Sequence, residues 1–94
     1  MAVLSSKSKL LKFYEKEGEI WEHKAIKEVM TQEGRTSAYW FSNARFWLIE
    51  LEANGLLELV DTKIDEGEME KGKLLHKYKI TEYGLSRAES MLRD

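Results

Sequence analysis

Apolar residues recur at helical spacing near the start of the chain. Leu10, Phe13 and Tyr14 lie at i, i+3 and i+4 within residues 5–17, and a serine that can cap a helix precedes them. Gly18 follows, a residue typical of helix ends. The pattern predicts a first helix over residues 5–17.

Two more stretches follow with the same periodicity. Residues 22–32 carry apolar side chains at helical spacing and predict a second helix. A third, longer helix is predicted over residues 37–54, because Thr36 or Ser37 can cap its start and Gly55 stands where it would end.

The remaining stretches favour strands and one last helix. Residues 19–21 are a short β-favouring trio, and residues 56–64 and 74–80 are longer β-rich runs. A polar stretch with two glycines, residues 65–73, separates the long runs and predicts a hairpin with a long tip. Apolar positions over residues 81–92 predict a C-terminal helix.

The third helix has two different faces. Its inward stripe is formed by Ser37, Trp40, Phe41, Ala44, Trp47, Leu48 and Leu51. Polar and apolar residues share the opposite face: Tyr39, Ser42, Asn43, Arg45, Phe46, Ile49 and Ala53. We therefore expect the inward tryptophans and Phe41 to pack in the core, and the second half of the helix to be buried on two sides. The sequence does not decide whether Tyr39 and Phe46 face a dimer partner, the hairpin or a small effector.

The composition bounds the class of protein. A chain of 94 residues with 43% hydrophobic residues suits one domain over residues 1–94. No cysteine is present, which favours a reducing, cytoplasmic location, and no uncharged run approaches the roughly 20 apolar residues of a membrane span. The start of the chain lacks the length of a signal peptide. The formal charge of −2 means that any nucleic-acid binding must rest on a local surface.

Two motifs carry a resemblance to known regulators. Residues 51–58, LEANGLLE, are similar to the recognition-helix exit of the MarR and PadR families. Residues 78–84, YKITEYG, are similar to the wing exit of the same families, where Thr81 caps the next helix. With the element order, the resemblance implies an α+β winged helix-turn-helix fold: helix, short strand, helix, recognition helix, β-hairpin wing and C-terminal helix. It implies a DNA-binding transcriptional regulator.

The start of the third helix holds side chains suited to DNA. Arginine can bond guanine, asparagine can bond adenine, and hydroxyls and helix N-termini suit phosphate. The candidate DNA contacts are Arg35, Thr36, Ser37, Tyr39, Ser42, Asn43, Arg45 and Lys73. Because Arg45 lies off the inward stripe, its loss is expected to change duplex binding more than melting temperature.

The wing departs from the family pattern. DNA-binding relatives tend to carry basic residues at the wing tip, whereas here four carboxylates outnumber two lysines. The tip is therefore either held away from a duplex or assisted by lysines on the strands. The acidic residues of the tip are Asp65, Glu66, Glu68 and Glu70, and the strand lysines are Lys63, Lys73, Lys77 and Lys79.

We expect a homodimer. Apolar residues of the first and last helices exceed what one small core can cover, so they predict a seam for a second copy. The seam residues are Leu10, Phe13, Tyr14, Leu85, Met91 and Leu92.

Catalytic and metal chemistry have little support. His23 is expected at the surface or at a cap, and His76 to be packed in a strand. No catalytic arrangement is present, and residues 61–67 fail as a calcium loop because Lys63 stands at a ligand position. We expect no enzyme activity, metal or cofactor, and the sequence leaves open whether an effector binds. The alternative to DNA binding is a winged-helix protein interaction module, which an apolar patch at Tyr39, Phe46 and Ile49 would favour.

Overall fold

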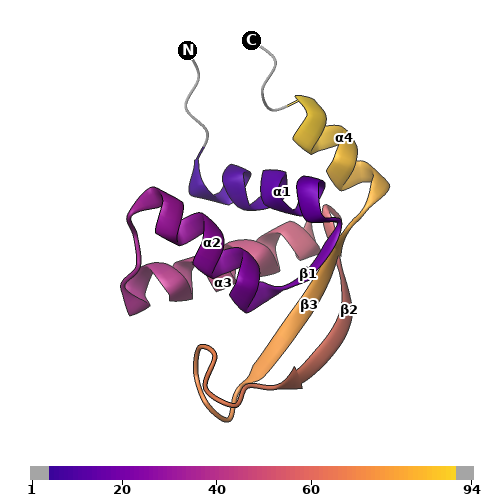
Figure 1. The fold of residues 1–94 in the computed structure, drawn as a ribbon. Coiled ribbons are helices and arrows are strands. Elements are labelled where there is room, and N and C mark those ends of the chain that lie inside the picture. The colour runs from indigo at the N-terminus through magenta and orange to yellow at the C-terminus, as the bar shows by residue number, and fades with distance from the viewer. Residues whose placement is uncertain (1–4, 91–94) are drawn as a thin grey trace.

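The computed structural model describes residues 5–90 and has the predicted element order (Figure 1). The elements are α1 (Ser6–Glu17), β1 (Glu19–Trp21), α2 (Glu22–Glu33), α3 (Ala38–Ala53), β2 (Leu57–Ile64), β3 (Leu74–Ile80) and α4 (Glu82–Ser90). Within the described residues the chain is thus an α+β structure with four helices and a three-stranded antiparallel sheet. This arrangement is compatible with a winged helix.

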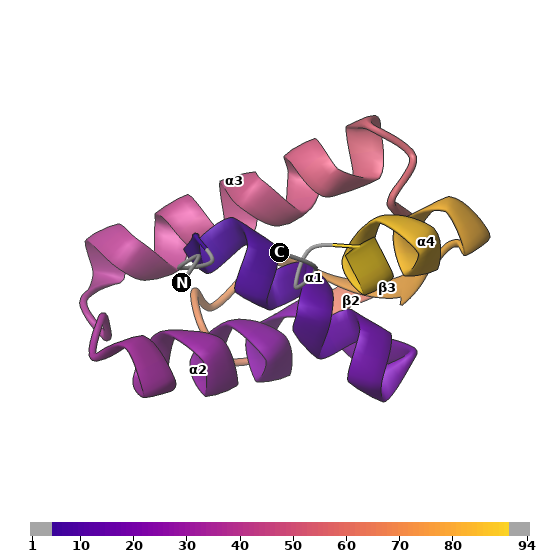
Figure 2. The ribbon, with the colours of Figure 1, turned by 90° about the horizontal axis from the view of Figure 1, so that it is seen from above.

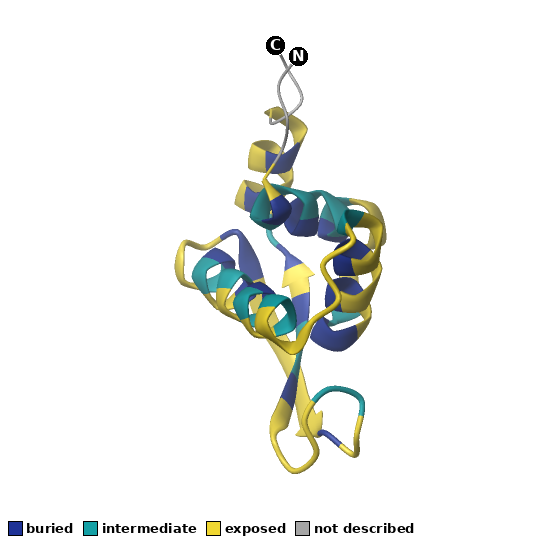
Figure 3. Cartoon of the chain, turned by 90° about the vertical axis from the view of Figure 1, so that its left-hand side faces the viewer, coloured by how far each residue is buried: buried dark blue, intermediate teal, exposed yellow. Residues whose placement is uncertain are grey.

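The sheet has the strand order β1-β3-β2, so the short β1 lies beside β3 and β2 forms the opposite edge. Tyr78 of β3 stands opposite Ile20 of β1 on one side and Leu59 of β2 on the other. The β2–β3 hairpin extends beyond the helices, and the loop at its end curls back toward them, as Figures 1 and 3 show. The predicted hairpin is confirmed.

Side-chain caps stand at the starts of three helices, where the sequence predicts them. Ser5 accepts a hydrogen bond from the Ser8 N–H at 3.1 Å, and Ser37 accepts one from the Trp40 N–H at 3.5 Å. Thr81 accepts from the Gly84 N–H at 2.9 Å. Together these bonds fix the starts of α1, α3 and α4.

The core lies where α1, α2 and α3 meet one face of the sheet (Figure 2). Tyr14 of α1 and Tyr78 of β3 pack edge to face with ring centroids 6.4 Å apart, and the Tyr14 hydroxyl donates to the Ile20 carbonyl at 3.0 Å. Burial, with a smaller contribution from the nearby Glu22 carboxylate, raises the pKa of both phenols well above the usual range. Both phenols therefore stay neutral.

Only one side of α3 is buried. Ala44, Leu48 and Leu51 are in the core, while the inward tryptophans and Phe41 are half-buried against it. Phe46 and Ile49 are 62% and 48% exposed, so the prediction that the second half of α3 is buried on two sides is wrong. The reason is that α1, α2 and β2, the elements in contact with α3, cover its inner side and leave these two residues outside.

The predicted dimer seam is wrong in part. Leu10 and Tyr14 are fully buried inside the chain's own core, because α1 contacts α2, α3, α4 and the sheet at once. Phe13 is half-buried against the same core, and Leu85 of α4 is exposed. The other two seam residues, Met91 and Leu92, lie outside the described residues.

No helix within residues 5–90 combines the length and the apolar character that crossing a bilayer requires.

Candidate nucleic-acid interface

The outward face of α3 forms one continuous stripe. Its exposed residues fall at helical spacing: Tyr39, Ser42, Phe46, Ile49 and Ala53. Thr36 and Ser37, both exposed, precede the first turn of the helix. The structure therefore brings four of the predicted DNA contacts, Thr36, Ser37, Tyr39 and Ser42, together at the start of α3. The stripe itself holds no lysine or arginine.

Arg35 and Asn43 are partly engaged by the fold. The Arg35 guanidinium lies 4.3 Å from the centroid of the Trp40 ring, and its Nη1 donates to the Ser6 hydroxyl at 3.3 Å. The Asn43 side-chain amide donates to the Tyr39 carbonyl of its own helix at 3.2 Å. Arg35 remains an exposed residue and Asn43 a half-buried one, so each has part of its surface toward solvent.

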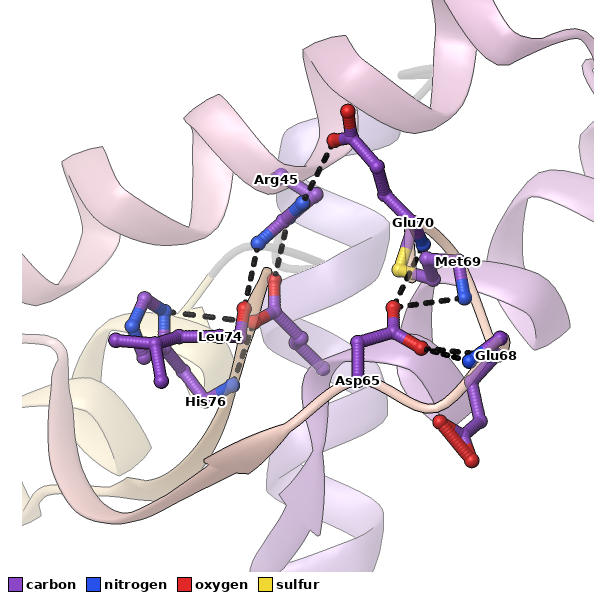
Figure 4. A network of polar contacts seen from close by, with 9 residues as sticks. Arg45, Asp65, Glu68, Met69, Glu70, Leu74 and His76 are labelled. Carbon is purple, nitrogen blue, oxygen red and sulfur yellow. Dashed lines mark hydrogen bonds and ion pairs between the residues drawn. The ribbon is translucent and has the colours of Figure 1, made fainter. Parts of the chain in front are cut away.

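Arg45 is built into the structure, as Figure 4 shows. Its Nε bonds the Glu22 carboxylate at 3.0 Å, its Nη2 donates to the Leu74 carbonyl at 2.9 Å, and its Nη1 lies 4.0 Å from Glu70. The side chain is only 23% exposed. Its guanidinium joins α2, α3, β3 and the hairpin tip, which removes the ground for expecting that the loss of Arg45 hardly changes the melting temperature.

Glu22 is the buried centre of this network. Its side chain is 2% exposed, and its second oxygen accepts the His76 N–H at 2.6 Å and lies 3.4 Å from the His76 ring. A buried carboxylate is stable only when its charge and its lone pairs are satisfied, which Arg45 and the His76 N–H do here. The predicted packing of His76 in its strand is confirmed in part, since the residue is half-buried.

The hairpin tip is folded around one carboxylate. Asp65 is 1% exposed and accepts four backbone N–H bonds, from Gly67, Glu68, Met69 and Glu70, at 2.6 to 2.9 Å (Figure 4). Burial acts to raise the pKa of Asp65, but the four N–H groups outweigh it and hold that pKa well below its usual range. The carboxylate therefore stays charged and orders the tip.

The tip also touches α3. Met69 is half-buried against the core, and a cavity of about 320 Å³ lies between tip and helix. Its lining residues are Ala38, Phe41, Ser42, Arg45, Met69 and Glu70. The acidic tip is thus folded back beside the predicted DNA contacts.

The strand lysines differ in their surroundings. Lys63 lies 4.6 Å from the centroid of the Trp21 ring, and Lys77 pairs with Glu19 at 3.2 Å. Lys73, the predicted contact, is exposed at the end of the tip, and Lys79 is exposed on β3. Lys73 thus has its charge near solvent, within the hairpin that flanks α3.

His23 is buried, so its expected surface position is wrong. Its Nδ1 has no hydrogen-bond partner among the described residues. Burial lowers the pKa of His23, and the Lys63 charge lowers it further. The other charged groups that act on the ring are Glu68 of the hairpin tip and Lys24 and Lys27 of α2.

Sequence analysis missed three structural residues, Glu22, Asp65 and Met69. An acidic residue at the start of a helix is ordinary, so nothing in the pattern marks Glu22 as buried. Asp65 carried a usable signal, because an aspartate two residues before Gly67 is typical of a turn that its side chain caps. Met69 stands among charged residues and gives no periodic signal.

Within residues 5–90, no group of three or more His, Asp and Glu side chains is placed to share a metal ion.

Comparison with known proteins gives no relative. No family model, no curated protein and no solved structure matches the chain. The resemblance to the MarR and PadR families rests on the two sequence motifs.

Proposed function

We propose that the chain is a winged helix-turn-helix domain that binds double-stranded DNA as a sequence-specific transcriptional regulator. The observation that carries this proposal is the exposed start of α3, with Thr36, Ser37, Tyr39 and Ser42 pointing away from the core and the hairpin beside them. A helix with its N-terminal half exposed in this way can enter the major groove.

The chemistry of the contacts follows from the side chains. The hydroxyls and the helix N-terminus suit phosphate, while the exposed parts of Arg35 and Asn43 suit guanine and adenine. Lys73 supplies a charge for the backbone. As a homodimer, the protein would place two copies of α3 about 34 Å apart, one turn of the duplex. It would act in the cytoplasm with the DNA that it binds.

The test is selection from random duplexes at about 50 mM salt, where contacts with phosphates are screened less than at physiological salt. The binding of two matched variants to the selected duplex is then compared with that of the unchanged chain. Ser42→Glu places a carboxylate on the exposed start of α3 and should weaken binding by about tenfold or more through phosphate repulsion. Ser86→Glu adds the same charge on α4 and should leave binding unchanged. Equal binding by all three proteins, or no selected duplex, would overturn the proposal.

A second candidate function is a protein interaction module. Tyr39, Phe46 and Ile49 are 69%, 62% and 48% exposed, and they form an apolar stripe without a cation. Contiguous exposed apolar residues mark interaction surfaces.

The two functions predict different effects of one variant. Phe46→Ser with Ile49→Ser removes the apolar part of the stripe and keeps the hydroxyls at the start of α3. A DNA-binding protein should keep most of its duplex affinity, whereas an interaction module should lose its protein partner and show no selected duplex in either form.

A further inference from the structure

Strand β2 is a long open edge of the sheet. In the described part of the chain it pairs with β3 alone, and each of its residues after Leu57 is exposed. Leu59, Val60 and Ile64 are apolar residues on this exposed strand. The other edge, β1, has three residues. An exposed edge with apolar side chains is a template for pairing with another strand.

The register with β3 shows which side chains share a face. Leu57, Leu59, Thr62 and Ile64 stand opposite Ile80, Tyr78, His76 and Leu74, so all four share one face of the sheet, the face that carries the buried Tyr78 and Ile80. Glu58, Asp61 and Lys63 stand opposite Lys79, Lys77 and Leu75 and point to the other side. An irregularity between Leu59 and Asp61 makes this alternation change at Val60.

Two-fold pairing of β2 with a second β2 must bring residues of the same face together. Two registers do so over most of the strand. One places Glu58 opposite Asp61 of the second copy, which sets like charges against each other. The other places Glu58 opposite Lys63, Leu57 opposite Ile64 and Leu59 opposite Thr62, so opposite charges meet twice.

We propose that a second copy of this chain docks along β2, antiparallel and in the register that pairs Glu58 with Lys63. The argument is the self-complementarity of the strand in both charge and face. The Glu58 carboxylate forms no ion pair within the described residues. Lys63 lies 4.6 Å from the centroid of the Trp21 ring, so in the dimer it exchanges this contact for Glu58 of the second copy. In this register Asp61 stands opposite Val60 of the second copy rather than opposite another carboxylate, and its Oδ1 accepts the Thr62 N–H at 2.8 Å.

This interface is separate from the α1 and α4 seam predicted from the sequence, and it does not depend on DNA binding. One pair of eight-residue strands is at the small end of protein interfaces, and the irregularity at Val60 interrupts the ladder at its centre. The dimer therefore forms reversibly and at high protein concentration.

The register can be tested by disulfide formation, since the chain contains no cysteine. Leu59→Cys and Thr62→Cys are made as separate variants and oxidised alone and as an equal mixture. In the proposed register residue 59 faces residue 62 of the other copy, so the mixture should give at least about tenfold more covalent dimer than either variant alone. Equal yields in all three samples would overturn the register.

Charge exchange tests the same pairing without cysteine. Sedimentation equilibrium of the full chain should show a dimer that Glu58→Lys or Lys63→Glu each weakens by about fivefold to tenfold in Kd, and that the double exchange restores. Lys79→Glu, on the neighbouring strand, is the control and should have a smaller effect. A monomer at all concentrations, or a dimer that only Leu85→Glu disrupts, would overturn the proposal.

Discussion

The two ends of the molecule are held together by different kinds of contact. At the helical end, apolar side chains such as Leu48, Leu51 and Ile26 pack to complete burial or close to it. At the hairpin end, two buried carboxylates hold the structure together by hydrogen bonds: Asp65 orders the tip and Glu22 binds Arg45. Apolar packing tolerates small shifts, whereas these polar contacts depend on specific partners at hydrogen-bond distance.

The difference has a consequence for stability. Changes in the apolar core should lower the stability of the whole domain, because every helix packs on it. Changes at the tip should act locally and leave the core folded. Glu22 stands between these cases, since it is buried in the body of the domain but supports the hairpin.

The largest effect is expected for Leu51→Ala. Removing a side chain that is 2% exposed leaves a cavity and should cost about 2 to 5 kcal/mol in free energy of unfolding. Ile49→Ala on the exposed face of the same helix is the matched control and should cost less than about 1 kcal/mol. Urea denaturation followed by circular dichroism measures both. Equal losses would mean that the two faces of α3 do not differ as described.

The next effect concerns Glu22→Gln. The amide leaves the Arg45 guanidinium without its buried counter-charge, so unfolding should become easier by about 3 kcal/mol. Glu19→Gln removes a carboxylate that pairs with Lys77 in an exposed position and should cost about 0.5 kcal/mol or less. Arg45→Ala should also lower the melting temperature, contrary to the expectation from sequence. A stability unchanged by Glu22→Gln would contradict the network.

The same contrast explains what the sequence could predict. Helices, strands and the core face of α3 follow from periodicity and caps, which are local properties that Leu48, Ser37 and Gly55 display in their own segments. The network does not follow, because Glu22 meets residues 23 and 54 positions away and no local pattern pairs them. Leu10 and Tyr14 were assigned to a dimer partner for a related reason. They are buried because α1 packs against both α2 and α4, and such contacts between distant segments leave no local pattern in the sequence.

A smaller effect, confined to the tip, is expected for Asp65→Asn. An asparagine amide replaces one carboxylate oxygen by a donor, so at least two of the four N–H bonds are lost. Amide hydrogen exchange of Gly67, Glu68, Met69 and Glu70 should speed up while the core amides keep their protection. Glu66→Gln, on an exposed neighbour, should leave the tip amides unchanged.

The pH dependence of the tip follows from the lowered pKa of Asp65. A carboxylate with a folded-state pKa below its unfolded value stabilises above the unfolded value of about 3.9 and loses that contribution as pH falls through the folded one. The NMR shifts of the tip amides should therefore stay constant from pH 7 to pH 4. Loss of the tip signals near pH 5 would contradict the four-bond arrangement.

The smallest effect should come from His23, which stands at the start of α2 and is influenced by charges of both the helical end and the hairpin end. Its pKa is lowered, so as pH falls below about 6.5 the unfolded chain takes up a proton before the folded one does, and stability declines with decreasing pH. The charged groups around it, Lys63 on β2, Glu68 in the tip, and Lys24 and Lys27 on α2, set the slope together with burial. Thermal melts between pH 7 and pH 5 should show a shallow fall in melting temperature that His23→Gln flattens. A slope that His23→Gln leaves unchanged would contradict the assignment of this pH dependence to His23.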